Sequence, residues 1–542
     1  MILFALIVLP LIAAAFIPLV QEKSVKTVAM VGTLIPLGVG IGVALGFDWM
    51  AAGYQFETSF AWIEPMGLEL SVGVDSVAMS LILLALLLGP VCVGASYTAI
   101  TKKVRTYYTW LLVLQAAMVG VFAARDLIFF YICFEFTLVP MYIMISLYGS
   151  ANRAKAATKF FLYTFTGSMV ALAGLMYVAW FNASVLGNEW TFDIATLTAA
   201  GQQMSGVEQA WVMAAMLAGF AVKVPLFPFH TWLPLAHTEA PTAGSVILAG
   251  VLLKLGTYGI FRFVLPITPE AVAEFAPFLA TLSIIGIIYA GLICWVQTDV
   301  KKLVAYSSVS HLGFCVLGLV ALNGPGLSGS VLYMINHGLS TGGLFLLIGM
   351  IYERYHTRSM NELGGLAGKM PVWSCFMVFF AMASVGLPGL NGFVSEFLCM
   401  MGTFQADSSW AGAIGTTPGN LGPWFAAFAG TGVIVAAIYI LYMVGKVCFG
   451  PLKEPGAHLD HGDDHVLPTD LCAREIGVLL PLAAGCLILG VAPSPLLKSL
   501  EAPITEITEI YTLDRGDRGP VLAPLGDAPA PVSNHDYDGG AH

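Results

Sequence analysis

Charged side chains are scarce in this sequence. Only 10% of the 542 residues are Asp, Glu, Lys or Arg, and 58% are hydrophobic, whereas soluble domains carry about 25% charged residues. The scarcity of charge excludes a soluble domain and predicts a protein that crosses a membrane many times. The formal net charge of −10 comes from acids in loops and in the C-terminal tail, and we expect no nucleic acid among the partners.

Paired cysteines are absent as well. The nine cysteines stand singly, mostly within apolar runs, and no Cys-x-x-Cys motif occurs. Iron–sulfur clusters need grouped thiolates, so we interpret these cysteines as small core residues. We therefore expect no cofactor and no metal in this chain, and any redox chemistry would belong to other chains.

Long hydrophobic runs fill most of the sequence instead. A helix needs about 20 apolar residues to cross the hydrocarbon core of a bilayer. The runs predict an all-α polytopic membrane protein with 14 transmembrane helices, at 2–20, 27–47, 77–100, 107–124, 127–148, 160–182, 207–232, 243–265, 275–297, 303–322, 328–352, 372–402, 423–449 and 474–497.

Lys and Arg residues are unevenly distributed among the connections. Sixteen of the 23 lie in or beside odd-numbered connections, and two lie in or beside even-numbered ones. Because cytoplasmic loops are enriched in Lys and Arg, we expect the odd-numbered connections on the cytoplasmic side and both termini on the outer, periplasmic side. Asp299, Lys301 and Lys302 are placed in such a loop and interpreted as topology determinants.

Two of the predicted helices contain helix-breaking residues. Helix 7 includes AVKVPLFPFH (221–230), and helix 12 includes MASVGLPGLNGFVSEFL (382–398). Proline removes a backbone donor, so both helices should be broken near mid-membrane. The two breaks lie five helices apart, and this odd offset predicts two inverted five-helix repeats, helices 4–8 and 9–13, as in many transporters.

These repeats define the predicted domains. They are 1–106 (helices 1–3 with an external hairpin), 107–265 (first repeat), 275–449 (inverted second repeat), 450–513 (loop and helix 14) and 514–542 (disordered acidic tail). The hairpin is predicted because apolar residues alternate in LELSVGVD (68–75). The loop segment HLDHGDDH (458–465) could suggest a metal site, but we favour a solvated acidic segment.

Four ionised side chains lie well inside the predicted helices. They are Glu135 in helix 5, Lys223 in helix 7, Lys254 in helix 8 and Glu396 in helix 12. A charge at the bilayer centre costs about 2.5–3.5 kcal/mol even on a lenient scale, so each needs a partner, water or a function. One interpretation is purely structural, with Glu135 paired to Lys223 and Lys254 paired to Glu396.

The other interpretation is proton transfer, and we favour it. A lysine in a low-dielectric site holds its proton weakly, and a nearby carboxylate strengthens the hold. A change in the separation of Glu135 and Lys223 would therefore load or unload a proton, and the break at Pro225 and Pro228 would admit water. Buried ion pairs seldom stabilise a protein more than apolar replacements do, which weakens the structural interpretation.

Histidines extend this series of ionisable groups. His311 lies in SSVSHLGF (helix 10) and His337 in MINHGLSTGG (helix 11), and histidine relays protons because its charge changes near neutral pH. Either one alone could equally be a packing residue, but polar neighbours favour a wettable relay. His230, His237 and Glu239 follow the break in helix 7, where they either line a proton uptake path or cap and anchor the helix.

Five segments resemble a known family. The chain M family of antiporter-like membrane subunits of the proton-pumping NADH:quinone oxidoreductase, respiratory complex I, is similar at FEFTLVPMY (134–142), AVKVPLFPFHTWLPLAHTEAPTAGSVILAGVLLKLGTYGIFRF (221–263), SSVSHLGF (307–314), INHGLSTGGLF (335–345) and LPGLNGFVSEF (387–397). The resemblance implies fourteen helices, inverted repeats and outside termini. It matches the family's proton-translocating residues to Glu135, Lys223, Lys254, His311, His337 and Glu396.

One departure from the family concerns proton uptake. The family usually has an Asp where this sequence has Leu235, so an uptake role of that acid is absent or moved. The resemblance supplies no counterpart for the His/Asp-rich loop or for the tail.

The resemblance also implies a function. The chain would be a translocase subunit that couples electron transfer from NADH to quinone, carried out in partner subunits with FMN and iron–sulfur clusters, to proton pumping. Its neighbours would be the antiporter-like chains L and N and membrane lipids, in the bacterial inner (plasma) membrane. The alternative is a subunit of a multi-subunit (Mrp-type) cation/proton antiporter. Glu396 favours chain M, since chains L and N have a lysine there, and the four intramembrane charges disfavour a structural scaffold.

Overall fold

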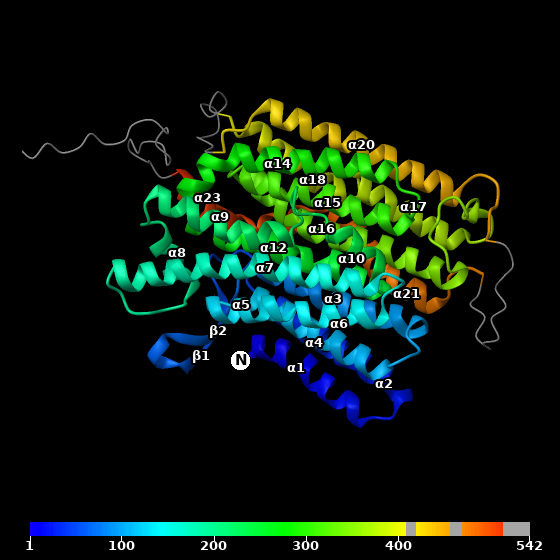
Figure 1. Ribbon diagram of the computed structural model, residues 1–542, viewed down its shortest axis with the longest axis horizontal. Helices are drawn as coiled ribbons and strands as arrows, with labels where there is room; N and C mark the ends of the chain where they lie inside the picture. The colour runs from blue at the N-terminus through cyan, green and yellow to red at the C-terminus, as the bar shows by residue number, and fades with distance from the viewer. Residues whose placement is uncertain (408–418, 456–468, 513–542) are drawn as a thin grey trace, which may run out of the picture.

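The computed structural model describes residues 1–407, 419–455 and 469–512, and its helices run mostly along one direction (Figure 1). Within these ranges, 12 helical segments are long and apolar enough to cross a membrane. Helices satisfy their backbone hydrogen bonds internally, which hydrocarbon requires. The prediction of a mostly helical, polytopic membrane protein is confirmed.

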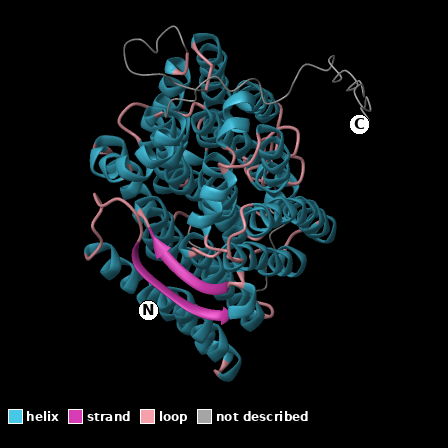
Figure 2. Cartoon of the chain, turned by 90° about the vertical axis from the view of Figure 1, so that its left-hand side faces the viewer, coloured by secondary structure: helices cyan, strands magenta, loops and turns pink. Residues whose placement is uncertain are grey.

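The N-terminal part packs a helical hairpin and a β-hairpin against two buried helices. Its elements are α1 (Ile2–Phe16), the 3-10 turn η1 (Ile17–Leu19), α2 (Glu22–Leu45), β1 (Gln55–Ile63), η2 (Glu64–Met66), β2 (Leu68–Val74), α3 (Ser76–Ala99) and α4 (Val104–Ala123). The antiparallel strands pair Gln55 with Val74 and Ile63 with Leu68 and lie at one end of the helices (Figure 2). The predicted hairpin is therefore present, and its alternation buries Leu68, Val72 and Val74.

The next part contains two bent or interrupted helices. Its elements are α5 (Leu127–Phe136), α6 (Leu138–Tyr148), α7 (Arg153–Trp180), the π-helical η3 (Phe181–Val185), α8 (Ile194–Gly201), α9 (Gly206–Lys223) and α10 (Leu233–Glu239). A continuous helix follows, composed of α11 (Thr242–Ile247), η4 (Leu248–Leu252), α12 (Leu253–Gly259), η5 (Ile260–Val264) and α13 (Leu265–Ile267). Its stretches η4 and η5 are π-helical.

The remaining part surrounds the helix α16, which is buried along almost its whole length. Its elements are α14 (Pro269–Trp295), α15 (Val300–Val320), α16 (Gly324–Tyr355), η6 (Leu366–Gly368), α17 (Pro371–Val385), α18 (Asn391–Gln405), α20 (Pro423–Cys448), α21 (Ala473–Val491), α22 (Ser494–Ser499) and α23 (Glu501–Thr512). Along α16 the side chains from Leu327 to Ile351 are buried with hardly an exception. The core therefore lies around α16 and the continuous helix Thr242–Ile267, which pack against each other.

Both predicted breaks occur. Helix α9 ends at Lys223, and α10 begins only at Leu233, because Pro225 and Pro228 offer no backbone donor. The Trp232 indole donates to the freed carbonyl of Val222 at 2.9 Å. Helix α17 ends at Val385 and is followed by Gly386, whose positive φ of 81° suits glycine, and α18 begins at Asn391. These interruptions explain why the segments predicted as helices 7 and 12 are not among the 12 continuous spans.

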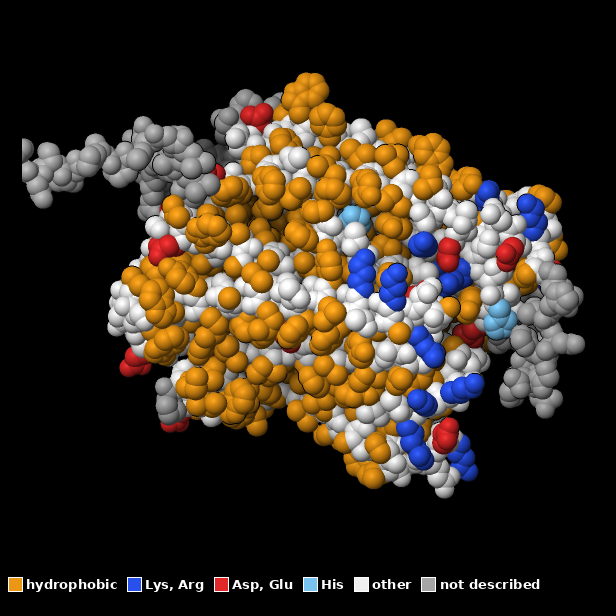
Figure 3. Space-filling model, viewed as in Figure 1, with side chains coloured by type: hydrophobic (Ala, Val, Ile, Leu, Met, Phe, Trp, Pro, Cys, Tyr) orange, Lys and Arg blue, Asp and Glu red, His pale blue; other side chains and the backbone are white. Residues whose placement is uncertain are grey.

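The surface separates apolar from basic side chains. Large apolar residues are exposed along α1, α2, α7 and α20, and in the space-filling view they cover the middle of the visible face (Figure 3). Lys and Arg gather at its right-hand end, opposite the N-terminus and α23 (Figures 1 and 3). Seven of the nine cysteines are buried, as expected, while Cys375 is exposed and Cys472 is partly buried. The segment 458–465 and the tail 514–542 lie outside the described residues.

Candidate functional site

Lys254 and His337 meet at the centre of the core. Lys254 is fully buried on α12, and its Nζ lies 2.7 Å from Nδ1 of His337 on α16. An ammonium group has donors only, so a charged Lys254 donates to Nδ1 of His337. The Nε2 atom of His337 has no hydrogen-bond partner among the described residues.

The local helix geometry supplies a second acceptor for Lys254. The π-helical stretch η4 directly precedes α12, and the Ala249 carbonyl within it accepts a hydrogen bond from Lys254 Nζ. In a π-helix the carbonyls are displaced from the usual α-helical partners, and such bulges are frequent at functional sites. Here the bulge turns a backbone carbonyl toward a buried ammonium group and so lowers the cost of burying it.

A second cluster links His311 to Glu396 through a tyrosine. The His311 ring lies 5.8 Å from the His337 ring, centroid to centroid. Nδ1 of His311 is 2.6 Å from the Tyr333 hydroxyl, which in turn donates to Oε1 of Glu396. Nε2 of His311 lies 3.2 Å from the Ser384 hydroxyl at the end of α17. The predicted residues Lys254, His337, His311 and Glu396 are therefore brought together.

Glu396 is held close to the break between α17 and α18. A Cβ atom at Gly386 would stand 2.6 Å from Oε2 of Glu396, so the absence of a side chain there makes room for the carboxylate. The glycine also ends α17 with a positive φ. One residue thus both breaks the helix and shapes the space around the buried acid.

Glu135 and Lys223 form a separate group. Both carboxylate oxygens of Glu135 and the Nζ of Lys223 are buried without a hydrogen-bond partner among the described residues. Lys223 Nζ lies 4.3 Å from the centre of the Phe134 ring, a cation–π contact. The two charges act on each other electrostatically, but no ion pair of 4.0 Å or less joins these two described residues. Lys254 and Glu396 are not paired directly either, so neither predicted salt bridge is present.

The three residues predicted for proton uptake have different surroundings. His230 stacks on Phe227 and is buried, with its Nδ1 unpartnered among the described residues. His237 is fully buried, both of its ring nitrogens lack a partner in the described part of the chain, and its ring stacks on Phe345 at 4.7 Å. Glu239 instead accepts hydrogen bonds from Ser150 Oγ at 2.8 Å and the Asn152 amide at 2.9 Å, which anchors the end of α10.

The placement of Lys301 in a loop is wrong. Asp299 caps α15 by accepting from the amides of Lys301 and Lys302 at 2.8 and 3.1 Å, so the helix begins at Val300 and includes both lysines. Lys301 is buried and donates to the Ala240 carbonyl at 2.5 Å, whereas Lys302 is exposed. The Asp299 cap starts the helix earlier than hydropathy suggests.

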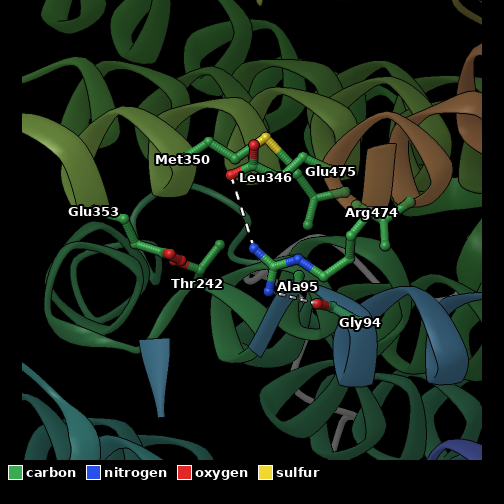
Figure 4. Close-up of a pocket in the computed structure, with 9 residues that line it drawn as sticks. Gly94, Ala95, Thr242, Leu346, Met350, Glu353, Arg474 and Glu475 are labelled. Atoms are coloured by element: carbon green, nitrogen blue, oxygen red, sulfur yellow. Dashed lines mark hydrogen bonds and ion pairs between the residues drawn. The ribbon is translucent and has the colours of Figure 1, made fainter. Parts of the chain in front are cut away.

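A small cavity whose lining includes Glu353, Arg474 and Glu475 lies near the basic end of the same helices (Figure 4). Arg474 points into it and contacts Glu475 at 3.9 Å and the Gly94 carbonyl at 3.4 Å. Glu475 is buried and also binds Arg354 at 2.7 Å. Opposite, Glu353 accepts from the Thr98 hydroxyl at 2.5 Å. These charges are largely paired, which indicates that the cluster fastens α21 to α3 and α16.

Sequence analysis missed Tyr333 and Ser384. A signal for Tyr333 was present, because it precedes His337 by four residues and therefore shares its helical face. No comparable signal singled out Ser384, which reaches His311 only through tertiary packing. Among the described residues, no group of three or more His, Cys, Asp or Glu side chains could hold a metal ion.

The helical bundle is apolar, two of its helices are interrupted, and a series of lysine, histidine and glutamate side chains is buried inside it. These features define an ion-translocating membrane protein. Comparison with known families agrees, since the family described as NADH:quinone oxidoreductase/Mrp antiporter, TM, matches residues 124–422. NADH-quinone oxidoreductase subunit M of Rhodobacter capsulatus is 38% identical over 94% of this chain and 96% of its own length. NADH-ubiquinone oxidoreductase chain 4 of Marchantia polymorpha is 35% identical over 94% and 97%. The chain therefore belongs to the subunit M family of NADH-quinone oxidoreductase.

Solved structures share the fold. A chain of respiratory complex I from Thermus thermophilus superposes with a TM-score of 0.80 at 28% identity, covering 94% of this chain and 99% of that one. A chain of the Mrp complex from Dietzia has a TM-score of 0.78 at 21% identity, covering 98% of this chain and 54% of that one. The second similarity concerns the fold alone.

Proposed function

We propose that this chain is the proton-translocating membrane subunit of an NADH:quinone oxidoreductase and that Glu135, Lys223, Lys254, His337, His311 and Glu396 carry the proton. The observation that carries this proposal is the buried series from Lys254 to Glu396, with its 2.7 Å lysine–histidine contact. Ionisable groups this deep in an apolar bundle are expensive and unnecessary for packing.

Two groups of residues have different roles in the proposed proton transfer. The unpaired charges of Glu135 and Lys223 form the switch, because a change in their separation alters how firmly the lysine holds its proton. The hydrogen-bonded residues Lys254, His337 and His311 form the relay that ends at Glu396. Water enters beside Lys223, where the break of α9 leaves its Nζ without a partner among the described residues.

Proton uptake involves His237 more than Glu239. Two unpartnered ring nitrogens in a fully buried histidine call for water, and His237 is electrostatically coupled to Lys254 and Lys301. The hydrogen bonds that Glu239 receives support an anchoring role for that residue. His230 lies beside the break and completes the uptake region.

The membrane arrangement follows the sequence prediction. We propose fourteen crossings, with the interrupted helices as the seventh and twelfth, and inverted repeats at 107–265 and 275–449. The segments 1–106, 450–513 and 514–542 complete the domain division. The basic end faces the cytoplasm and both termini face the periplasm of the bacterial inner membrane. Supporting this orientation, the N-terminus and α23 lie at the end opposite the visible Lys and Arg (Figures 1 and 3).

The redox work belongs to other subunits. NADH, FMN, the iron–sulfur clusters and quinone are held by partner chains, and the neighbours in the membrane are the antiporter-like chains L and N together with lipids. The competing assignment, a subunit of an Mrp-type cation/proton antiporter, draws on a shared fold at 21% identity. The relatives at 35 to 38% identity over nearly the whole chain support the oxidoreductase.

Substitution of the buried lysines in the assembled enzyme tests this function. Lys254→Met and Lys223→Ala remove the ammonium groups, and Lys302→Ala removes an exposed lysine as the control. In proteoliposomes we expect both buried substitutions to lower the number of protons translocated per NADH oxidised, and the control to keep it. A normal ratio at the normal rate in both Lys254→Met and Lys223→Ala would refute the proposal.

A further inference from the structure

Tyr333 connects two of the proposed proton carriers, His311 and Glu396, through short hydrogen bonds. It lies on α16 and is 3% exposed. Its hydroxyl is 2.6 Å from Nδ1 of His311 and donates to Oε1 of Glu396. The direct separation of Nδ1 and Oε1 is 3.5 Å, beyond the usual hydrogen-bond range of about 2.7–3.2 Å. The route with the shorter hydrogen bonds from histidine to glutamate therefore runs through the tyrosine hydroxyl.

The directions of these hydrogen bonds fix where the protons are. An ionised carboxylate only accepts, and a tyrosine hydroxyl has one proton. Because Tyr333 gives that proton to Glu396, Nδ1 of His311 must be the donor to the tyrosine oxygen. The opposite ring nitrogen, Nε2, faces the Ser384 hydroxyl at 3.2 Å and is the position at which a further proton can arrive.

A pair of asparagines holds this geometry. Asn336, next to His337, donates to the Asn391 carbonyl at 2.7 Å, and Asn391 donates back to the Asn336 carbonyl at 3.1 Å. Asn336 also donates to Ser395 at 3.1 Å, the residue before Glu396. The start of α18 is thereby fastened to α16, which keeps Glu396 opposite Tyr333.

We propose that the Tyr333 hydroxyl is a relay group of the proton pathway, transferring the proton from His311 to Glu396. This inference rests on the proposed function and adds a residue to it. When His311 is doubly protonated, the N–H bond at Nδ1 breaks and an O–H bond to Tyr333 forms, while the original tyrosine proton moves to Oε1 of Glu396. The products are neutral His311 with its proton on Nε2, neutral tyrosine and protonated glutamic acid.

The link then requires a reset. After Glu396 has released its proton, the tyrosine hydroxyl turns back toward the carboxylate, and the one remaining imidazole proton exchanges from Nε2 to Nδ1, which restores the starting tautomer of His311 without adding a proton. Each transfer therefore reverses the hydrogen-bond directions, and the reset restores them before the next proton. A phenylalanine at this position would keep the ring and remove the only atom that can carry out both steps.

Tyr333→Phe in the assembled enzyme tests the relay. The control is Tyr107→Phe, which removes an equally buried hydroxyl that contacts Ser96 at 3.0 Å, away from the pathway. Positioned proton-transfer groups accelerate a step by about a hundred-fold or more. We therefore expect Tyr333→Phe to slow the transfer by about that factor and to lower the protons translocated per NADH, and we expect Tyr107→Phe to leave this ratio unchanged.

The Lys254→Met variant distinguishes a failure of the tyrosine relay from a failure of the proposed function. If Lys254→Met lowers the ratio and Tyr333→Phe does not, the relay is refuted and the proposed function stands. If Tyr333→Phe, Lys254→Met and Lys223→Ala all keep the normal ratio, both the relay and the proposed function are refuted.

Infrared spectroscopy supplies a measurement that a merely structural tyrosine would not affect. The carbonyl stretching band of protonated Glu396 is identified by its loss in Glu396→Gln. With the relay, this band forms about a hundred-fold more slowly after NADH is added in Tyr333→Phe and at the unaltered rate in Tyr107→Phe, whereas a tyrosine that only holds Glu396 in place would shift the band and leave its rate of formation unchanged. If Tyr333→Phe does not assemble, 3-fluorotyrosine at position 333 preserves the shape and changes the donor strength, so the rate of band formation must again change. An unaltered rate of formation overturns the proposal.

Discussion

Two glycines in the break between α17 and α18 allow a matched test of the site. Gly386 and Gly389 have positive φ values of 81° and 93°, so alanine costs about 1–2 kcal/mol of stability at either position. The two positions differ in their surroundings. A Cβ at Gly386 would lie 2.6 Å from Oε2 of Glu396, whereas a Cβ at Gly389 would meet nothing within 4 Å.

The magnitude of the functional effect follows from this distance. To restore an ordinary separation of about 3.5 Å, the Glu396 oxygen must move by about 0.9 Å. A displacement of about 1 Å in a reacting geometry can cost about a hundred-fold in rate. We therefore expect Gly386→Ala to lower proton translocation per NADH strongly and Gly389→Ala to leave it nearly unchanged, although both lower the unfolding temperature of the purified enzyme.

The assay combines NADH oxidation with acidification of the interior of proteoliposomes, measured with a pH-sensitive dye. The thermal unfolding of both variants in detergent serves as the control for strain. Equal translocation by the two variants, whether normal or impaired, would refute the role assigned to the space beside Glu396.

Three further predictions follow from other parts of the structure. Arg354→Met should destabilise the protein by about 3–5 kcal/mol because it removes the closest charged partner of the buried Glu475 carboxylate and leaves the longer contact with Arg474. The double variant with Glu475→Gln should recover much of the loss in thermal unfolding. Burial raises the pKa of the Asp126 carboxyl to about 6, although hydrogen bonds from the amides of Phe129, Glu69 and Ile128 oppose this rise. The folded state then binds more protons than the unfolded state, so the contribution of Asp126 to stability should fall as the pH rises from about 4 to above 6. Asp126→Asn keeps the helix cap and should remove this pH dependence of the unfolding temperature. A cysteine at the exposed position Met50 should react with a membrane-impermeant maleimide applied from the periplasmic side and one at Val296 should not; the reverse pattern would contradict the proposed orientation.

Hydropathy and helix breakers predicted the coarse fold because both reflect strong local constraints. Lys223, Pro225 and Pro228 lie where α9 stops, and the glycine and proline residues of 386–390 lie where α17 stops. Helix ends that depend on capping were less predictable. Asp299 starts α15 before its apolar run begins, so Lys301 becomes a buried helical residue.

Four of the predicted site residues meet in space because a buried charge is costly wherever it occurs in an apolar run. The pairing between them was not predictable, since it depends on tertiary geometry. Lys254 contacts His337 and the Ala249 carbonyl, and Glu396 contacts Tyr333. Neutral partners such as Tyr333 and Ser384 escape a search for charges, although they complete the hydrogen bonds of the charged ones.

The series from Lys254 to Glu396 has an electrical consequence. In the proposed cycle, its first member starts as an ammonium group and its last as an ionised carboxylate, while the histidines and the tyrosine between them start neutral. The two ends then carry opposite charges across a low-dielectric medium. Transfer of one proton from the lysine to the glutamate neutralises both ends, which lowers the electrostatic free energy in such a medium. Restoring the two charges requires free energy, because a proton must leave Glu396 and another must bind Lys254. The partner subunits would supply energy to the cycle at this step.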